Sequence, residues 1–190
     1  MLPHQILIDE RAIETRVNEL ASVIAADLEG QPPILLGLLT GSFVFLADLA
    51  RALSRCGVEP KVDFLIVSHY GLSTDPTRAA QIEKDTRLDL TGQAVLIVDD
   101  ILDSGRSIAT VVEHLSRHKP AWLRVCAFLV KPSQCMTPMK VDYVGFEVPD
   151  EWLIGYGLDL GGQGRALPYI GAVEKKPRIE SSEQLTAKSD

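Results

Sequence analysis

Three aspartates that lie close together in one segment are the residues best suited to chemistry. The segment reads VLIVDDILDSGRSIAT over residues 95–110, and its apolar start is typical of a buried strand. Asp99, Asp100 and Asp103 follow at once. Carboxylates bind hydroxyl groups and divalent cations, and they can accept a proton. Because ligands of open α/β sheets bind beyond the carboxyl ends of the strands, we predict a polar ligand site at the two adjacent acids, where this strand is expected to end.

The residues after the third aspartate are suited to binding an anion. Ser104, Gly105, Arg106 and Ser107 form a turn that opens a helix-like stretch. Such a turn exposes backbone N–H groups, and the helix dipole and the serine hydroxyls add to their attraction for an anion. Neither GxGxxG nor GxxxxGK[ST] occurs in the sequence, which disfavours the dinucleotide fingerprint and the P-loop. The structural alternative is that the acids are turn and N-cap residues only.

The rest of the chain predicts elements that would position this site. An apolar stripe indicates an amphipathic helix that ends near Gly30 and contains Ile13, Val17, Leu20, Ile24 and Leu28. Apolar runs predict strands and helices in alternation, with strands at 34–39, 62–67, 94–98 and 123–130 and helices at 43–53 and 107–118. Continuous apolar strands that alternate with helices indicate an α/β fold with a mostly parallel sheet covered on both faces.

Two stretches depart from this alternation. Residues 68–93 form a connection of 26 residues, a length that is uncommon inside a compact domain and indicates either a disordered segment or a functional lid. Residues 81–90 within it are also compatible with a hairpin at the sheet edge. After residue 140 the chain consists of short strand-like pieces, which predict a small antiparallel or irregular cap.

Length and composition predict one domain. The chain has 190 residues, of which 46% are hydrophobic and 24% charged, and these values are typical of a folded globular protein rather than a disordered one. The net charge of −7 argues against broad binding to nucleic acid or to an anionic membrane. Charges of both signs balance from residue 174 onward. We therefore expect a single domain over 1–173 and a flexible charged tail over 174–190.

Cysteine content and apolar run length bear on location. Cys56, Cys126 and Cys135 form neither an even set nor a CxxC pair, so we predict three reduced packing residues. No segment approaches the roughly 18 apolar residues of a membrane span, and the N-terminus has no signal-peptide pattern. We expect a cytoplasmic protein with no membrane partner.

These motifs together resemble those of the type I phosphoribosyltransferases. Their signature is a strand with two acids followed by a D-[ST]-G-x-[ST] loop that binds phosphoribosyl pyrophosphate (PRPP), and DDILDSGRS matches it. Further stretches narrow the resemblance to the hypoxanthine (6-oxopurine) phosphoribosyltransferases, namely LLTGSFVFLADL (38–49), SHYG (68–71), KP (131–132) and DYVGFEVPDEWLIGYGLDLGGQGR (142–165). The resemblance implies a core over about 30–140 with a mostly parallel sheet flanked by helices. It implies a hood made of the N-terminal residues and about 141–173.

The resemblance implies which residues bind PRPP. Asp99 and Asp100 match the acids at the ribose 2′ and 3′ hydroxyls, and Asp103 matches the candidate general base near purine N7. The 5′-phosphate loop is matched by Ser104, Gly105, Arg106 and Ser107, with Ile108. The pyrophosphate loop is matched by Leu39, Thr40 and Gly41, and in the family it often contains a non-proline cis peptide bond between its first two residues. Arg165 matches the guanidinium that grips pyrophosphate.

The resemblance also implies a purine site, a metal ion and a lid. Lys131 matches the lysine at the purine C6 oxygen, Trp152 the ring stacked on the base, and Leu153 the residue whose backbone reads the edge of the base. Asp159 matches an acid on the ligand side that binds Mg²⁺, the implied cofactor, and the metal-binding set is Asp159, Asp99 and Asp100. The base of the lid is matched by Ser68, His69 and Tyr70.

Three residues depart from the family pattern. Thr40 stands where many relatives carry Lys or Arg, which removes a positive charge from the pyrophosphate loop. His69 stands where the family has a serine before the lid tyrosine, which puts the ordering contact of the lid in doubt. Asp99 replaces the Glu of many 6-oxopurine enzymes and has a shorter reach.

The implied reaction is displacement of pyrophosphate from C1 of PRPP by N9 of hypoxanthine or guanine, giving IMP or GMP in purine salvage. The expected partners are PRPP and a 6-oxopurine base, with no nucleic acid. We also expect a homo-oligomer, a dimer or a tetramer, and exposed apolar surface on the 42–55 helix would be compatible with either. One alternative is a regulatory protein that senses PRPP or a nucleotide on the same fold, and the sequence lacks the basic stripe that such a protein needs for nucleic acid. A uracil- or xanthine-directed transferase is a further alternative, and the choice among hypoxanthine, guanine and xanthine stays open.

Overall fold

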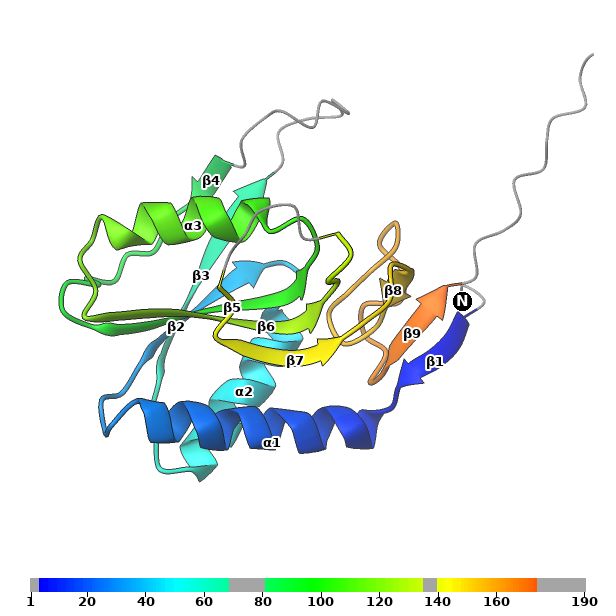
Figure 1. Ribbon diagram of the computed structural model, residues 1–190, viewed down its shortest axis with the longest axis horizontal. Helices are drawn as coiled ribbons and strands as arrows, with labels where there is room; N and C mark the ends of the chain where they lie inside the picture. Colours follow the sequence, from blue (N-terminus) through cyan, green and yellow to red (C-terminus); the bar gives the residue numbers. More distant parts are fainter. Residues whose placement is uncertain (1–3, 69–80, 135–139, 174–190) are drawn as a thin grey trace, which may run out of the picture.

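A mostly parallel six-stranded sheet forms the body of the molecule (Figure 1). The computed structural model describes residues 4–68, 81–134 and 140–173. The strands in spatial order are β4 (Gln81–Lys84), β3 (Lys61–Ser68), β2 (Ile34–Leu39), β5 (Ala94–Leu102), β6 (Trp122–Val130) and β7 (Tyr143–Glu147). Only the edge pair β3–β4 is antiparallel. This confirms the predicted α/β fold, and the edge hairpin expected within 81–90 is present as β4.

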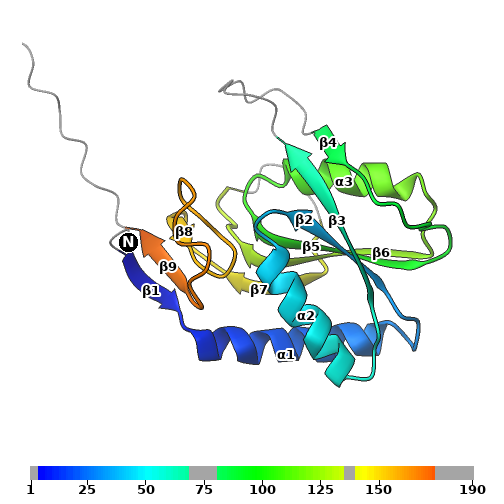
Figure 2. The same cartoon turned by 180° about the vertical axis from the view of Figure 1, so that it is seen from behind.

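Helices cover both faces of this sheet. α1 (Glu10–Asp27) and α2 (Phe43–Arg55) lie on one face, and α3 (Arg106–Ser116) lies on the other (Figures 1 and 2). Alternate residues of β5 point to opposite faces, so that Leu96 packs in the core under α1 and α2 while Ile97 packs in the core under α3. The strands are continuously apolar because both of their faces are buried.

The predicted amphipathic helix is confirmed as α1. Asp9 caps its N-terminus by accepting a hydrogen bond of 2.8 Å from the N–H of Ala12, which satisfies one of the free donors of the first turn. Its buried stripe packs against α2 and β7 and consists of Ile13, Val17, Leu20, Ala21 and Ile24. This helix therefore belongs to the core and not to the predicted hood. Of the N-terminal residues, only those of the strand that precedes the helix, His4–Ile8, lie in the small second sheet.

The hood is a small antiparallel sheet of three strands in the order β1 (His4–Ile8), β9 (Ile170–Val173) and β8 (Trp152–Ile154). It lies beyond the carboxyl ends of β5, β6 and β7 (Figure 1). The prediction that the hood begins near residue 141 is wrong for β7, which pairs in parallel with β6 through Cys126–Tyr143 and Leu129–Phe146. β7 is nearly as apolar as the hood strands, so its sequence does not distinguish the two sheets.

The cysteines differ from one another in their surroundings. Cys126 is fully buried on β6, and burial raises the pKa of its thiol. Cys56 is exposed at the end of α2, so the prediction of a packing role is wrong for this residue. Cys135 lies outside the described residues. Within the described ranges no helix is both long and apolar enough to cross a membrane.

Candidate active site

Two adjacent carboxylates lie near the carboxyl end of β5. Asp99 is 8% exposed, and its Oδ1 accepts a hydrogen bond of 3.1 Å from the N–H of Asp100. Burial and the neighbouring charge of Asp100 raise the pKa of Asp99 well above its ordinary value, and burial raises that of Asp100. The prediction that the strand ends at this pair is wrong. β5 continues to Leu102, because Ile101 and Leu102 still pair with β6.

The predicted pyrophosphate loop lies beside this pair, because β2 and β5 are parallel neighbours whose carboxyl ends share one edge of the sheet. The Leu39–Thr40 peptide bond is cis, a feature that the resemblance made possible but that the sequence did not decide. Ser42 is fully buried, and its hydroxyl donates a hydrogen bond of 2.7 Å to the carbonyl of Leu38 across the loop. A cavity of about 190 Å³ joins the loop to the pair and is lined by Leu38, Leu39, Thr40, Gly41, Val67, Asp99, Asp100, Ile101 and Ser107.

Gly41 allows the loop to approach the acidic pair closely. A Cβ atom at this position would lie 1.7 Å from Oδ2 of Asp100, closer than any non-bonded contact. Only glycine fits there while the Asp100 carboxylate stays in place. The loop and the pair are therefore one structural unit.

The predicted 5′-phosphate loop borders a second cavity next to the first. This cavity has a volume of about 180 Å³ and is lined by Asp99, Ile101, Leu102, Asp103, Ser104, Gly105, Ser107 and Ile108. Gly105 has a φ of +80° and is the N-cap of α3, so the first turn of the helix is capped by a residue without a side chain. The positive end of the α3 dipole therefore borders this cavity, where it would attract an anion. Asp103 is exposed in the same loop.

The hood contributes a positive charge to the same place. Arg165 donates to the carbonyl of Gly157 and pairs with Asp159, whose Oδ2 accepts a hydrogen bond of 2.7 Å from the N–H of Gly162. The charge of Arg165 also opposes the rise in the pKa of Asp100 that burial causes. Arg165 is held in place by a backbone carbonyl and by one carboxylate.

Gly157 is a residue of the site that sequence analysis missed. It has a φ of +104°, and a Cβ atom here would lie 2.0 Å from the carbonyl oxygen of Gly41. The hood and the pyrophosphate loop therefore meet backbone to backbone at two glycines. The segment 155–164 contains several glycines, and nothing in their spacing indicates which of them makes this contact.

Of the predicted base-binding residues, Lys131 directly follows β6, and Trp152 and Leu153 lie on β8. Lys131 is 9% exposed, and its N–H donates a hydrogen bond of 3.0 Å to the carbonyl of Leu102, next to Asp103. Leu153 is buried, whereas the side chain of Trp152 is 58% exposed and leaves a ring face open. The structure thus places the lysine beside the phosphate loop and the tryptophan at the start of β8.

Asp150 is a second residue that sequence analysis missed. Its Oδ1 lies 3.5 Å from Nζ of Lys131, and its Oδ2 accepts a hydrogen bond of 2.8 Å from Nε2 of Gln134. The carboxylate comes from the loop before Trp152 and faces the buried ammonium group. An opposite charge at this distance holds Lys131 in one position without removing all of its donors.

The predicted lid falls largely outside the described residues. Ser68 is the last residue of β3, and its hydroxyl is buried without a hydrogen-bond partner among the described residues. His69 and Tyr70 are not described. The lid assignment of these residues therefore stays a prediction.

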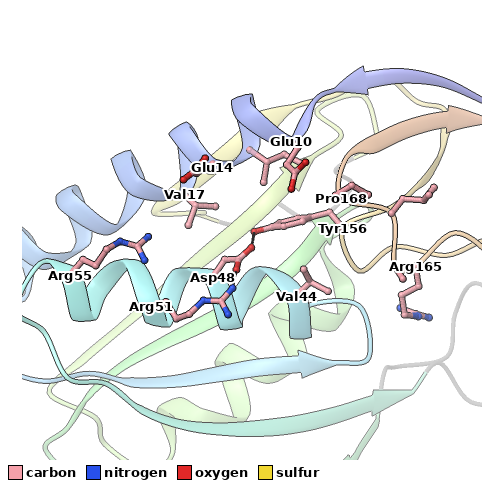
Figure 3. Close-up of a pocket in the computed structure, with 13 residues that line it drawn as sticks. Glu10, Glu14, Val17, Val44, Asp48, Arg51, Arg55, Tyr156, Arg165 and Pro168 are labelled. Atoms are coloured by element: carbon pink, nitrogen blue, oxygen red, sulfur yellow. Dashed lines mark hydrogen bonds and ion pairs between the residues drawn. The ribbon is translucent and has the colours of Figure 1, made fainter.

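A larger cavity lies between α1, α2 and the hood (Figure 3). Its volume is about 530 Å³, and of the predicted site residues only Arg165 lines it. The hydroxyl of Tyr156 donates a hydrogen bond of 2.7 Å to Asp48 there, which ties the hood to α2. The acidic pair and both predicted loops line the two smaller cavities instead.

The acidic pair fits a hard divalent cation such as Mg²⁺. Its donors are carboxylate oxygens, which Mg²⁺ prefers, and a nearby cation would stabilise the ionised form of both buried acids. Asp159 fits less directly, because one of its oxygens is paired with Arg165 and the other is bound by a backbone N–H. Of the predicted metal-binding set, Asp99 and Asp100 are the better ligands.

The fold and this site define a class of protein: the chain belongs to the phosphoribosyltransferase family, whose phosphoribosyl transferase domain matches residues 5–160. Its relatives are more specific. A hypoxanthine-guanine phosphoribosyltransferase of Aquifex aeolicus is 43% identical over 90% of this chain and 94% of that protein. The hypoxanthine phosphoribosyltransferase of Escherichia coli K12 is 42% identical over 89% and 94%. A crystal structure of a Bacillus anthracis hypoxanthine-guanine phosphoribosyltransferase has a TM-score of 0.85 and 37% identity, and covers 92% of this chain and all of that one.

Proposed function

We propose that this chain is an enzyme of purine salvage that transfers the 5-phosphoribosyl group of PRPP to N9 of hypoxanthine, giving IMP and pyrophosphate, and that it also accepts guanine. The convergence of the pyrophosphate loop, the acidic pair and the phosphate loop on two adjoining cavities carries this proposal. Similarity to hypoxanthine phosphoribosyltransferases over nine-tenths of the chain supports it.

The phosphate end of PRPP is held by backbone and hydroxyl groups. Ser104 and Ser107, with the N–H groups that follow Gly105, bind the 5′-phosphate at the positive end of α3. Asp99 and Asp100 accept hydrogen bonds from the ribose 2′ and 3′ hydroxyls, which orients C1 toward the base. These contacts fix the ribose while its other end reacts.

The pyrophosphate end is bound by the loop of Leu39, Thr40 and Gly41 and by Arg165. Negative charge grows on the leaving pyrophosphate as the ribose becomes oxocarbenium-like, so a guanidinium placed here stabilises the transition state more than the ground state. Thr40 brings no charge to the loop, and Arg165 is accordingly the main side-chain cation for this group. Asp99 and Asp100 would hold Mg²⁺, which when bound would supply further neutralisation of the charge on the leaving group.

The base is selected and deprotonated by residues around β6. Lys131 donates to the C6 oxygen of the purine, which favours 6-oxopurines over adenine, and Asp150 positions its ammonium group. Trp152 stacks on the ring and the backbone of Leu153 contacts its edge. Asp103 accepts the proton at purine N7 as N9 attacks C1.

The oligomeric state and the cellular location are not established by the similarity to known proteins. We retain a homo-oligomer as a prediction, although α1 covers most of the apolar residues of α2 and leaves only Phe43 of its large hydrophobic side chains 41% exposed. The cytoplasmic location also stays a prediction from the cysteine content. The regulatory alternative is not favoured, because the relatives are transferases.

A base-selection assay tests the proposed function. Steady-state rates with PRPP and Mg²⁺ are measured for hypoxanthine, guanine, xanthine, adenine and uracil. We expect turnover of hypoxanthine and guanine and, in Lys131→Ala, a fall in kcat/KM for hypoxanthine of about 10–10³-fold, because one hydrogen bond to the base is lost. Absence of turnover with every base, together with tight PRPP binding, would support the regulatory alternative instead.

A further inference from the structure

A carboxylate and two imidazoles converge on the face of the molecule where α3 packs against the sheet edge. Asp85 follows β4 directly, His114 lies in the last turn of α3, and His118 lies just beyond that helix. One potential ligand atom from each of the three lies within 4.8 Å of the other two. Oδ2 of Asp85 is 2.6 Å from Nε2 of His114, and the two imidazole rings are 5.4 Å apart.

The local structure explains why these groups meet. His118 follows in the turn that continues α3, four residues after His114, and its ring packs edge-on against that of His114. Asp85 is held in place because its Oδ1 accepts a hydrogen bond of 2.7 Å from the N–H of Thr86, which leaves Oδ2 facing the imidazoles. The Asp85 and His114 side chains are 39% and 30% exposed, so an ion can reach them from solvent.

An ion pair alone does not account for the cluster. The contact between Asp85 and His114 would meet the hydrogen-bonding needs of both side chains without a third group. His118 nevertheless brings a second imidazole within 4.8 Å of them. Asp89 lies nearby as well: hydrogen bonds from Thr91 lower the pKa of its carboxyl, and the charge of His118 lowers it further. Two imidazoles and a carboxylate are the ligand types of zinc sites that keep an open position.

We infer that Asp85, His114 and His118 form a binding site for one divalent transition-metal ion, best matched by Zn²⁺, with water in the fourth position. Bonds of about 2.0–2.1 Å in a tetrahedron separate ligand atoms by about 3.3 Å, so Asp85 and His114 move slightly apart and His118 moves in. Imidazole ligands disfavour Mg²⁺ and Ca²⁺, which prefer oxygen donors, and so this site takes a different ion from the acidic pair.

The ion would join two elements that border the active site. Asp85 is attached to the edge strand β4, whose partner β3 ends at Ser68. His114 is eight residues along α3 from Arg106 of the phosphate loop, which is roughly 12 Å at the rise of a helix. The site is therefore separate from the reacting groups, and its expected effect is to stabilise the packing of β4 on α3.

Metal titration of the full chain tests this inference. The purified protein is first treated with chelator and then titrated with Zn²⁺ by calorimetry and with Co²⁺ by visible absorption. We expect one ion per chain, cobalt bands of a nitrogen- and oxygen-ligated tetrahedral site, and a rise in Tm with Zn²⁺. His118→Ala and Asp85→Asn should each weaken Zn²⁺ binding about tenfold or more and remove the rise in Tm.

Glu113→Gln is the matched control, because it removes an exposed carboxylate from the same turn of α3 that only pairs with Arg117. It should bind Zn²⁺ as the unchanged chain does. His118 is exposed at the end of the helix, so its loss leaves the fold intact, which circular dichroism checks. Equal Zn²⁺ affinity of the unchanged chain and of His118→Ala, or no binding by either, would overturn the inference.

Discussion

Asp99 and Asp100 are held where the folded chain disfavours their charge. Asp99 is buried and the adjacent Asp100 is partly buried, and burial together with the charge of Asp100 raises the pKa of Asp99 well above that of an unfolded chain. A carboxyl with a raised pKa in the folded state binds its proton more tightly when folded. Stability therefore falls as pH rises from the unfolded pKa, about 3.9, toward the folded one, and the loss is complete above it.

Asp99→Asn should stabilise the chain at neutral pH while it impairs activity. The substitution removes a buried charge, and we expect a gain of about 1–2 kcal/mol in the free energy of unfolding at pH 8, as is common when a functional site is relieved of such a cost. The gain should shrink as pH falls and be lost below about 4, as the carboxyl becomes protonated in the unfolded chain as well as in the folded one. Denaturant unfolding across this pH range measures it.

The control for this prediction is Glu113→Gln, which neutralises an exposed carboxylate. Its stability should stay within about 0.5 kcal/mol of the unchanged chain at every pH. A destabilised Asp99→Asn at pH 8 would show that the carboxylate is compensated within the fold.

Asp103→Asn tests the proton acceptor. The side chain is exposed in the phosphate loop, so its loss leaves the fold and the anion-binding N–H groups in place. We expect kcat to fall about 10²–10⁴-fold with little change in KM for PRPP, because a general base acts in the transition state. Steady-state kinetics measure both values, and a kcat like that of the unchanged chain would remove Asp103 from this role.

Gly41→Ala tests whether the loop and the acidic pair form one unit. The added methyl group would lie 1.7 Å from Oδ2 of Asp100, so the carboxylate or the loop must move. We expect kcat/KM for PRPP to fall about 10²-fold, the effect of a displacement of about 1 Å at a reacting centre. Gly92→Ala is the control: its Cβ meets open space at a φ of +68°, so it should cost stability and leave kcat unchanged.

At the scale of elements, sequence analysis predicted correctly the strands that are buried on both faces and the helix that is buried along one face. The strands of the core sheet are apolar throughout because α1, α2 and α3 cover both faces, and the stripe of α1 follows its one buried face. The end of β5 was predicted too early, since its two acids interrupt the apolar run although pairing with β6 continues. Strand pairing is a tertiary property, and for the same reason β7 was placed in the wrong sheet.

The site residues show the same division. Residues within a contiguous motif, such as Asp99, Asp103 and Gly105, were found from the sequence and line the two cavities. Gly157 and Asp150 were missed because their roles depend on contacts across the fold, with Gly41 and Lys131 respectively. Roles that depend on neighbouring residues in one segment can be predicted from the sequence, whereas roles that depend on contacts between distant segments become visible only in the folded structure.

Tyr156→Phe tests the connection between the hood and α2. The hydroxyl donates to Asp48 (Figure 3). The ring packs on Phe128 in the core and would stay there. We expect a loss of about 1–2 kcal/mol in the free energy of unfolding, because a buried hydrogen bond to a carboxylate is removed. KM for PRPP should rise a few-fold, since the same hood segment carries Gly157 and Arg165.

Tyr169→Phe is the matched control. Its hydroxyl is hydrogen-bonded at 2.9 Å to His4 within the hood and does not reach α2. It should lower stability by a similar or smaller amount and leave KM for PRPP unchanged. An equal rise in KM in both variants would mean that general loosening of the hood, and not its connection to α2, sets the position of Arg165.

At the scale of the whole molecule, a chain with a net charge of −7 is proposed to bind a highly anionic substrate. Long-range attraction is therefore weak, and binding depends on local groups: backbone N–H groups at α3, Arg165, and a cation at the acidic pair. Part of the negative charge lies at the site itself, in Asp99, Asp100, Asp103 and Asp159. The acidity that disfavours nucleic acid thus serves to hold ribose hydroxyls and a metal ion.

The whole-molecule prediction concerns where the domain ends. In the hood, β1 pairs with β9 from His4–Val173 to Ile8–Ile170, so the first and last described strands close the fold on each other. A chain that ends at residue 175 keeps every described element, and we expect its Tm within about 2 °C of the full chain, with unchanged kcat.

A chain that begins at Asp9 lacks β1 and leaves one edge of β9 unpaired. Its Tm should fall by about 5–10 °C, as the loss of several backbone hydrogen bonds predicts. Equal Tm values for the two shortened chains would show that β1 is dispensable and that the domain begins at α1.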